Sequence, residues 1–183
     1  MTSIESIREW FVDAADLAVE NASSSTILEG ARLFAERIRE APARPFDPRT
    51  FEVLSASHAV NDTALGERFG ALAADLRWST SPRWDDGGRE RALCVVASMF
   101  ELDDVVAGLV YLDAGGEYPE HNHPPQELYL PVAGTGRWRF GGAADFVEVR
   151  PGATLYNHPK DRHAIVAGDT PLVAMYVLWG QGI

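Results

Sequence analysis

The sequence predicts a mainly β protein in which an N-terminal helical region is packed on a β-barrel. Apolar residues recur at helical spacing as far as Leu76, whereas from Leu93 onward short runs of Val, Leu, Tyr and Phe alternate with Gly, Pro and Asp. The chain has 183 residues and 46% hydrophobic content, enough for one compact domain with a full core. We expect residues 1–78 to form the helical region and residues 79–183 the barrel.

Two helices are expected before residue 42, and each begins with a candidate capping box. Thr2 pairs with Glu5 in the first box, and Thr26 pairs with Glu29 in the second. Apolar residues then follow helical spacing at Ile7, Trp10, Phe11, Ala14, Leu17 and Ala18, and again at Ile27, Ala31, Phe34 and Ile38.

A proline-rich stretch ends the second helix, because proline lacks the backbone N–H that a helix interior needs. This stretch runs from Pro42 through Pro45 to Pro48. A third helix is expected from Asp62 to Leu76, with its apolar residues on one face.

The second half of the sequence predicts several short strands separated by turn residues, the pattern of an antiparallel sandwich or barrel. The expected strands are Val105–Leu112, Glu127–Ala133, Gly136–Phe140, Phe146–Val149, His163–Ala167 and Leu172–Trp179.

Charge and composition limit the partners. A formal net charge of −11 and a pI near 4.8 argue against nucleic acid and anionic membranes. The sequence contains no apolar stretch of membrane-spanning length and no basic-then-apolar signal pattern at its start, so we expect a cytoplasmic protein. Cys94 is the only cysteine, which excludes an intrachain disulfide and a Cys-rich zinc site, and its apolar surroundings favour a buried, inert thiol.

The residues that carry chemistry are concentrated around His121-Asn122-His123, followed by Glu127 and Tyr129. Residues two apart on a strand share a face, so His121 and His123 can point together into a barrel, as can Glu127 and Tyr129. Imidazole and carboxylate groups suit one divalent ion of Zn, Fe, Mn, Co or Ni, and the softness of these ligands does not choose among the metals.

The spacing of these residues resembles the cupin superfamily. Its first motif is present in full, from Gly115 through His121, His123 and Glu127 to Gly134. The second motif is kept in part: Gly152 fits its first glycine and His163 its metal-ligand histidine. The usual Pro, Gly and Asn of that motif are replaced by His158, Lys160 and Ala167. The resemblance implies a cupin barrel, a double-stranded β-helix of the jelly-roll type, whose metal ligands are His121, His123, Glu127 and His163.

The segment from Gly116 to Leu130 further resembles the cupin-type dimethylsulfoniopropionate lyases, which combine the metal motif with tyrosines at the places of Tyr118 and Tyr129. The resemblance extends to Gly136-Arg137-Trp138, to Val149–Gly152, to Tyr156–His158 and to His163-Ala164. It implies a metal-dependent carbon–sulfur lyase that splits a small zwitterionic sulfonium carboxylate into dimethyl sulfide and acrylate. A homodimer is compatible with this family.

Tyr129 and Tyr118 are the two candidates for the base that this elimination needs, because a nearby divalent cation favours a phenolate. Aromatic faces can hold the sulfonium by cation–π attraction. The expected substrate-binding residues are Trp138, Tyr156, Trp179 and His158, with Trp78 and Trp84 as further cage candidates and a structural role open for His158.

Two other functions remain open at this point. The first is a cupin metalloenzyme (lyase, isomerase or dioxygenase) acting on another small carboxylate. The second is a cupin that binds a small molecule without catalysis. The tyrosines favour the lyase, because a dioxygenase needs Fe²⁺ with open positions for O₂ rather than a phenolic base.

Overall fold

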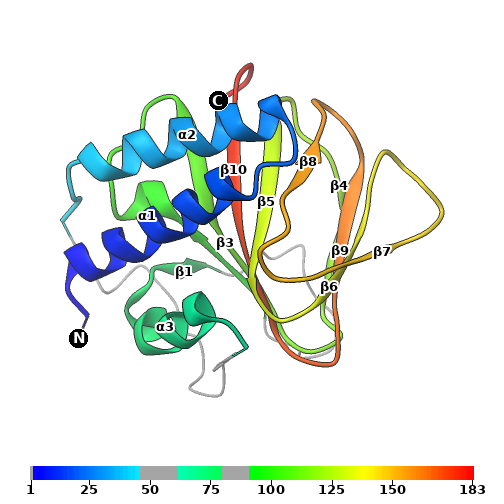
Figure 1. Cartoon of the computed structure of the whole chain (residues 1–183), viewed down its shortest axis with the longest axis horizontal. Helices are drawn as coiled ribbons and strands as arrows, with labels where there is room; N and C mark the ends of the chain where they lie inside the picture. The colour runs from blue at the N-terminus through cyan, green and yellow to red at the C-terminus, as the bar shows by residue number, and fades with distance from the viewer. Residues whose placement is uncertain (1, 46–61, 80–90) are drawn as a thin grey trace.

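The computed structural model describes residues 2–45, 62–79 and 91–183. In these residues two antiparallel sheets face each other, and helices cover the outer side of the larger sheet (Figure 1). The helices are α1 (Ile4–Glu20), α2 (Ser25–Glu40) and α3 (Ala64–Leu72), with 3₁₀ turns η2 (Ala73–Asp75) and η3 (Val96–Ser98). The strands are β1 (Trp78–Ser79), β2 (Arg91–Val95), β3 (Val105–Leu112), β4 (Glu117–His121), β5 (Gln126–Ala133), β6 (Gly136–Arg139), β7 (Val147–Val149), β8 (Leu155–Asn157), β9 (His163–Ala167) and β10 (Leu172–Trp179).

Helices α1 and α2 begin close to the predicted positions but use other caps. The side chain of Ser3, not Thr2, accepts the first free amide of α1, that of Ser6. Helix α2 is capped by Ser24, which accepts from Ile27 N–H, so the Thr26 capping box is also wrong. Consecutive hydroxyl residues offer several possible caps, and burial of the apolar face selects among them.

The third helical segment lies where the sequence predicts it, but it is less regular. The hydroxyl of Thr63 caps α3, which ends at Leu72 and continues as the 3₁₀ turn η2. Helix α2 ends at Glu40, before Pro42 and Pro45, while Pro48 lies outside the described residues.

The strands form a large sheet in the order β1-β2-β3-β10-β5-β8 and a small sheet in the order β4-β9-β6-β7, as far as the described ranges go. Three expected strands, β3, β9 and β10, have the predicted bounds. The expected strands omit β1, β2, β4 and β8, and of these β4 and β8 are short and lack an apolar run. The mainly β fold with N-terminal helices is confirmed.

The large sheet separates two hydrophobic clusters. Along β10, Val173, Met175, Val177 and Trp179 face the helices, while Leu172, Ala174 and Tyr176 face the small sheet. This alternation is the two-residue period of a strand. The cluster on the helix side is continuous with the apolar faces of α1, α2 and α3. The expected division between residues 78 and 79 therefore falls inside β1, a strand that pairs with β2 in the large sheet.

None of the helices among the described residues combines the length and the apolar composition that crossing a bilayer requires.

Candidate metal centre and active site

Three histidines converge between the two sheets. His121 lies at the end of β4, His123 follows it in the next turn, and His163 begins β9 directly opposite His121 in the strand register. One ring nitrogen from each lies within 4.8 Å of the others, a spacing at which one metal ion can be held. His163 is fully buried, whereas His121 and His123 are half-buried.

The backbone fixes the orientation of all three rings. His121 Nδ1 lies 2.8 Å from the carbonyl oxygen of Pro119, and His123 Nδ1 lies 3.1 Å from that of Pro125. His163 Nδ1 lies 2.9 Å from the carbonyl oxygen of Asp161. A carbonyl oxygen only accepts, so each Nδ1 carries the proton and donates it. In a neutral ring, Nε2 then presents a lone pair, the form in which histidine binds metals.

Glu127, on β5, faces two of these lone pairs. Its side chain is 3% exposed, and its Oε2 lies 3.1 Å from Nε2 of both His123 and His163. Burial raises the pKa of Glu127, but interactions with the two histidines outweigh burial and bring this pKa to about 2. Burial lowers the pKa of His123, yet the hydrogen bond and charge of Glu127 give a net rise.

This arrangement fits a cation. Two imidazole lone pairs and a carboxylate oxygen repel one another at 3.1 Å unless a positive charge lies between them. A proton on one histidine relieves only part of this repulsion, whereas a divalent ion bound by the two nitrogens and the oxygen relieves all of it. The residues present are therefore a suitable ligand set for a divalent transition metal.

A bulge in β4 brings Tyr118 to the same cluster. Tyr118 pairs with Ile165 of β9 and His121 pairs with His163, so three residues of β4 span two of β9. In a regular strand, residues three apart point to opposite faces. The extra residue of the bulge brings the side chains of Tyr118 and His121 to the same, inward face. The Tyr118 ring stacks on the His121 ring with centroids 4.2 Å apart. Burial raises the pKa of Tyr118 to about 12.

Two further tyrosines lie across from Tyr118. Tyr129 of β5 and Tyr176 of β10 are directly paired in the large sheet, with ring centroids 6.4 Å apart. Burial, reinforced by the nearby charge of Glu127, raises the pKa of Tyr129 well above its ordinary value. Gly108 lies opposite Tyr176, and a Cβ there would meet the tyrosine hydroxyl at 2.5 Å.

These groups enclose a cavity of about 140 Å³. Its lining comprises Tyr118, His121, His123, Glu127, Tyr129 and Tyr176 with the apolar residues Leu93, Val106 and Leu178. This volume is well below the roughly 300–1,000 Å³ of sites for drug-sized ligands. The cavity therefore suits a small molecule that has one end at the histidines and the other against aromatic and apolar side chains.

None of the four expected substrate-binding residues is among the residues that line this cavity. Trp138 is fully buried between the sheets, 6.3 Å from the Tyr129 ring, and is not among the residues that line the cavity. Tyr156 and Trp179 pack together on the helix side of the large sheet, and His158 is exposed beside Tyr156.

Two other tryptophans were cage candidates. Trp78 packs against Phe69 and Tyr111 in the core on the helix side, and Trp84 lies outside the described residues.

The departure from the second cupin motif leaves the local turn intact. Lys160, at the place of the motif's glycine, adopts a left-handed backbone with φ of 66°. Its N–H donates to the carbonyl oxygen of His123 at 2.8 Å and so connects the two ligand segments. A lysine thus takes a conformation that glycine adopts at lower cost.

Sequence reasoning missed Tyr176 and Asn157. Tyr176 shares a strand face with Ala174 and Leu178, and alternation along β10 would have placed it opposite Trp179. Asn157 lies next to Tyr156, and its amide donates to Glu127 Oε2 at 2.7 Å. The family resemblance included Asn157 within Tyr156–His158, but its contact with Glu127 could not be predicted without the pairing of β5 and β8.

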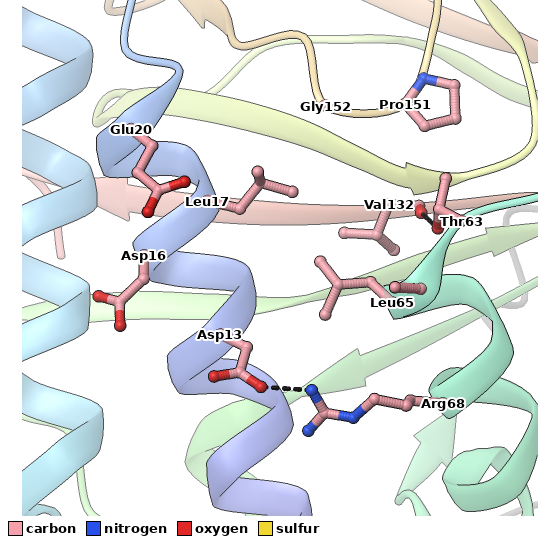
Figure 2. Close-up of a pocket in the computed structure, with 11 residues that line it drawn as sticks. Asp13, Asp16, Leu17, Glu20, Thr63, Leu65, Arg68, Val132, Pro151 and Gly152 are labelled. Atoms are coloured by element: carbon pink, nitrogen blue, oxygen red, sulfur yellow. Dashed lines mark hydrogen bonds and ion pairs between the residues drawn. The ribbon is translucent and has the colours of Figure 1, made fainter.

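A larger cavity of about 590 Å³ lies away from this chemistry, between α1, α3 and the adjoining end of β5 (Figure 2). Its lining includes Asp13, Asp16 and Glu20 from α1. Asp13 is paired with Arg68 and Asp16 with Arg39, so most of this negative charge is already compensated. None of the three clustered histidines lines it.

Comparison with known proteins places the chain in a family. The sequence profile of the dimethylsulfoniopropionate lyase family matches residues 49–174, more than half of the chain. A curated relative, dimethylsulfoniopropionate lyase DddQ of Ruegeria pomeroyi, is 34% identical over 123 residues. The match spans 63% of this chain and 60% of that relative's length.

Solved structures share the fold. The crystal structure of the DMSP lyase DddQ from Ruegeria pomeroyi superposes with a TM-score of 0.67 at 22% identity, covering 95% of this chain and 93% of the other. A structure reported with the DMSP lyases RdDddP and RnDddQII gives a TM-score of 0.70 at 20% identity and covers 99% and 96% of the two chains. The cupin fold is confirmed, and the chain belongs to the dimethylsulfoniopropionate lyase family.

Proposed function

We propose that this protein is a metal-dependent dimethylsulfoniopropionate lyase, which eliminates dimethyl sulfide from its substrate and leaves acrylate. The observation that carries the proposal is one small cavity lined by two histidines, a buried glutamate and three tyrosines, with His163 completing the histidine cluster beside it. Family membership narrows the reaction class, and the residues around the cavity supply the groups that this reaction needs.

His121, His123, His163 and Glu127 are the proposed metal ligands. A divalent ion bound there supplies positive charge beside the substrate carboxylate and so makes the neighbouring C–H more acidic. This assistance matters because removal of a proton next to a carboxylate builds negative charge on a group that is already anionic. The donor set accommodates Zn²⁺, Fe²⁺, Mn²⁺, Co²⁺ or Ni²⁺.

Tyr118 and Tyr129 are the proposed bases, since both line the cavity next to the histidines. Burial raises the pKa of both phenols in the metal-free protein, whereas a divalent ion held by the histidines and Glu127 would lower it and favour the phenolate. In the reaction, a phenolate oxygen takes the proton from the carbon next to the carboxylate. The electron pair of that C–H bond forms the C=C bond of acrylate, and the C–S bond breaks. The sulfur keeps the electrons of the C–S bond, so dimethyl sulfide leaves as a neutral molecule and needs no acid.

The remainder of the cavity suits the sulfonium group. The ring faces of Tyr118, Tyr129 and Tyr176 attract a cation with about 0.5–2 kcal/mol each. Leu93, Val106 and Leu178 offer apolar contacts for the methyl groups. A lysine or arginine in the lining would oppose such a ligand, and the described residues that line the cavity include neither.

The test is headspace detection of dimethyl sulfide from purified, metal-reconstituted protein supplied with dimethylsulfoniopropionate, with a chelated sample as control. We expect saturable release that the chelator abolishes and added metal restores. No release with any of the five metals, from protein shown to bind them, would overturn the lyase assignment and redirect the search to another small carboxylate.

A further inference from the structure

Asn157 is a buried polar residue that the metal motif does not include. It lies on β8 and is 2% exposed. In the antiparallel register it stands directly opposite Glu127 of β5, and its Nδ2 donates to Glu127 Oε2 at 2.7 Å. The same carboxylate oxygen faces Nε2 of His123 and of His163. Asn157 thus donates an uncharged hydrogen bond to the Glu127 oxygen that faces both His123 and His163.

Only one of the two polar atoms of the Asn157 side chain has a hydrogen-bond partner among the described residues. Asn157 Oδ1 is buried and makes no hydrogen bond within the described part of the chain. A buried polar atom without a partner costs about 1–3 kcal/mol, so an asparagine kept only for packing is a poor choice here. Its donor, by contrast, satisfies a buried carboxylate. The hydrogen bond to Glu127 is therefore the stabilising polar interaction that this side chain makes.

A glutamate side chain has rotatable bonds that burial alone does not fix, and its carboxylate can turn about the last of them. A hydrogen bond from Asn157 to Oε2 restricts that rotation and keeps Oε2 between the two histidines. Partners of this kind behind a ligand commonly change metal affinity by about 10–100-fold when they are removed.

We propose that Asn157 is a positioning residue for the metal centre, which holds the Glu127 carboxylate in the orientation that binds the ion. The proposal rests on the metal site of the proposed function. It does not depend on which substrate is processed, because Asn157 acts through Glu127.

The test measures Zn²⁺ affinity by competition with a colorimetric chelator in the full-length protein, together with melting temperature with and without Zn²⁺. Asn157→Leu removes the donor at similar volume, and Asn157→Ala removes it with a smaller side chain. Tyr156→Phe is the matched control. It deletes a hydrogen bond of 2.7 Å to Gln126 between the same two strands, one residue away on the opposite face.

We expect both Asn157 variants to bind Zn²⁺ about 10–100-fold more weakly, with a smaller metal-induced rise in melting temperature, while Tyr156→Phe keeps the wild-type affinity. Unchanged affinity in a folded Asn157 variant, or an equal loss in Tyr156→Phe, would overturn the positioning role and leave the proposed function standing. A wild-type protein that binds none of the five metals would overturn both.

Discussion

The phenol ring of Tyr118 stacks on the imidazole of His121, with ring centroids 4.2 Å apart and an angle of 28° between the planes. The two residues are three positions apart on one strand, where a regular pleat would place them on opposite faces. The bulge between them reverses this relationship. A base candidate and a metal-ligand candidate thus come from one short segment, and their relative position depends on a single extra residue.

Replacing only the tyrosine hydroxyls tests the proposed bases. Tyr118→Phe preserves the stacking on His121, and Tyr129→Phe preserves the packing against Trp138 and Tyr176. A general base contributes about 10²–10⁴-fold, so we expect turnover to fall by that factor in the variant that lacks the base. Metal content and melting temperature should stay close to wild type. Near-normal turnover in both variants would exclude a tyrosine base.

Trp179 and Tyr176 lie three residues apart on β10 but face opposite sides of the sheet. Trp179→Ala removes a buried indole that packs over Gly30 of α2, so we expect a loss of about 3–5 kcal/mol in unfolding free energy, measured in urea, with KM unchanged. Tyr176→Leu should instead raise KM, because the ring lines the cavity. A raised KM for folded Trp179→Ala would contradict this expectation and would mean that Trp179 contacts the substrate.

Acid sensitivity of the metal-free protein should depend on Glu127. Its pKa is about 2 in the folded protein against an ordinary value of 4.5, so its contribution to stability is present above pH 4.5 and is lost as the pH falls toward 2. Metal-free Glu127→Gln should therefore be less stable at pH 6 and lose less stability between pH 5 and pH 2, roughly the window of this titration. Parallel pH profiles of melting temperature for the two proteins would contradict this expectation.

Lys160 carries a backbone conformation that favours glycine, with φ of 66°. The left-handed conformation costs a residue with a Cβ about 1–2 kcal/mol of conformational energy. Glycine avoids this cost but loses roughly 0.5–1 kcal/mol more chain entropy on folding. Lys160→Gly should therefore raise unfolding free energy by up to about 1 kcal/mol, and Lys160→Val should lower it by at least as much. A destabilised glycine variant would mean that the lysine side chain itself stabilises the turn.

The sequence predicted those features that local pattern determines. The apolar runs 105–112, 163–167 and 172–179 are long enough to fix strands β3, β9 and β10, and the motif spacing singled out His121, His123, Glu127 and His163. Short strands without an apolar run, β4 and β8, escaped prediction because their pairing with β9 and β5 creates them. The inward direction of Tyr118 likewise depends on a register shift that no local pattern reveals.

The aromatic residues illustrate the same limit. Tyrosine and tryptophan occur both in hydrophobic cores and around bound cations. Only knowledge of which sheet face the helices cover distinguishes the two roles. The helix-packed face of β10 takes Trp179, and the barrel face takes Tyr176. The hydrogen bond from Asn157 to Glu127 became recognisable only when β8 was seen beside β5.

The most direct test of the central claim is a parallel measurement of metal content and product release in wild-type protein and His163→Ala. Elemental analysis gives metal per chain, and chromatography with headspace detection gives acrylate and dimethyl sulfide. We predict one divalent ion per chain, equal amounts of the two products, and loss of both metal and products in the variant. Product release that persists in metal-free protein would contradict the account.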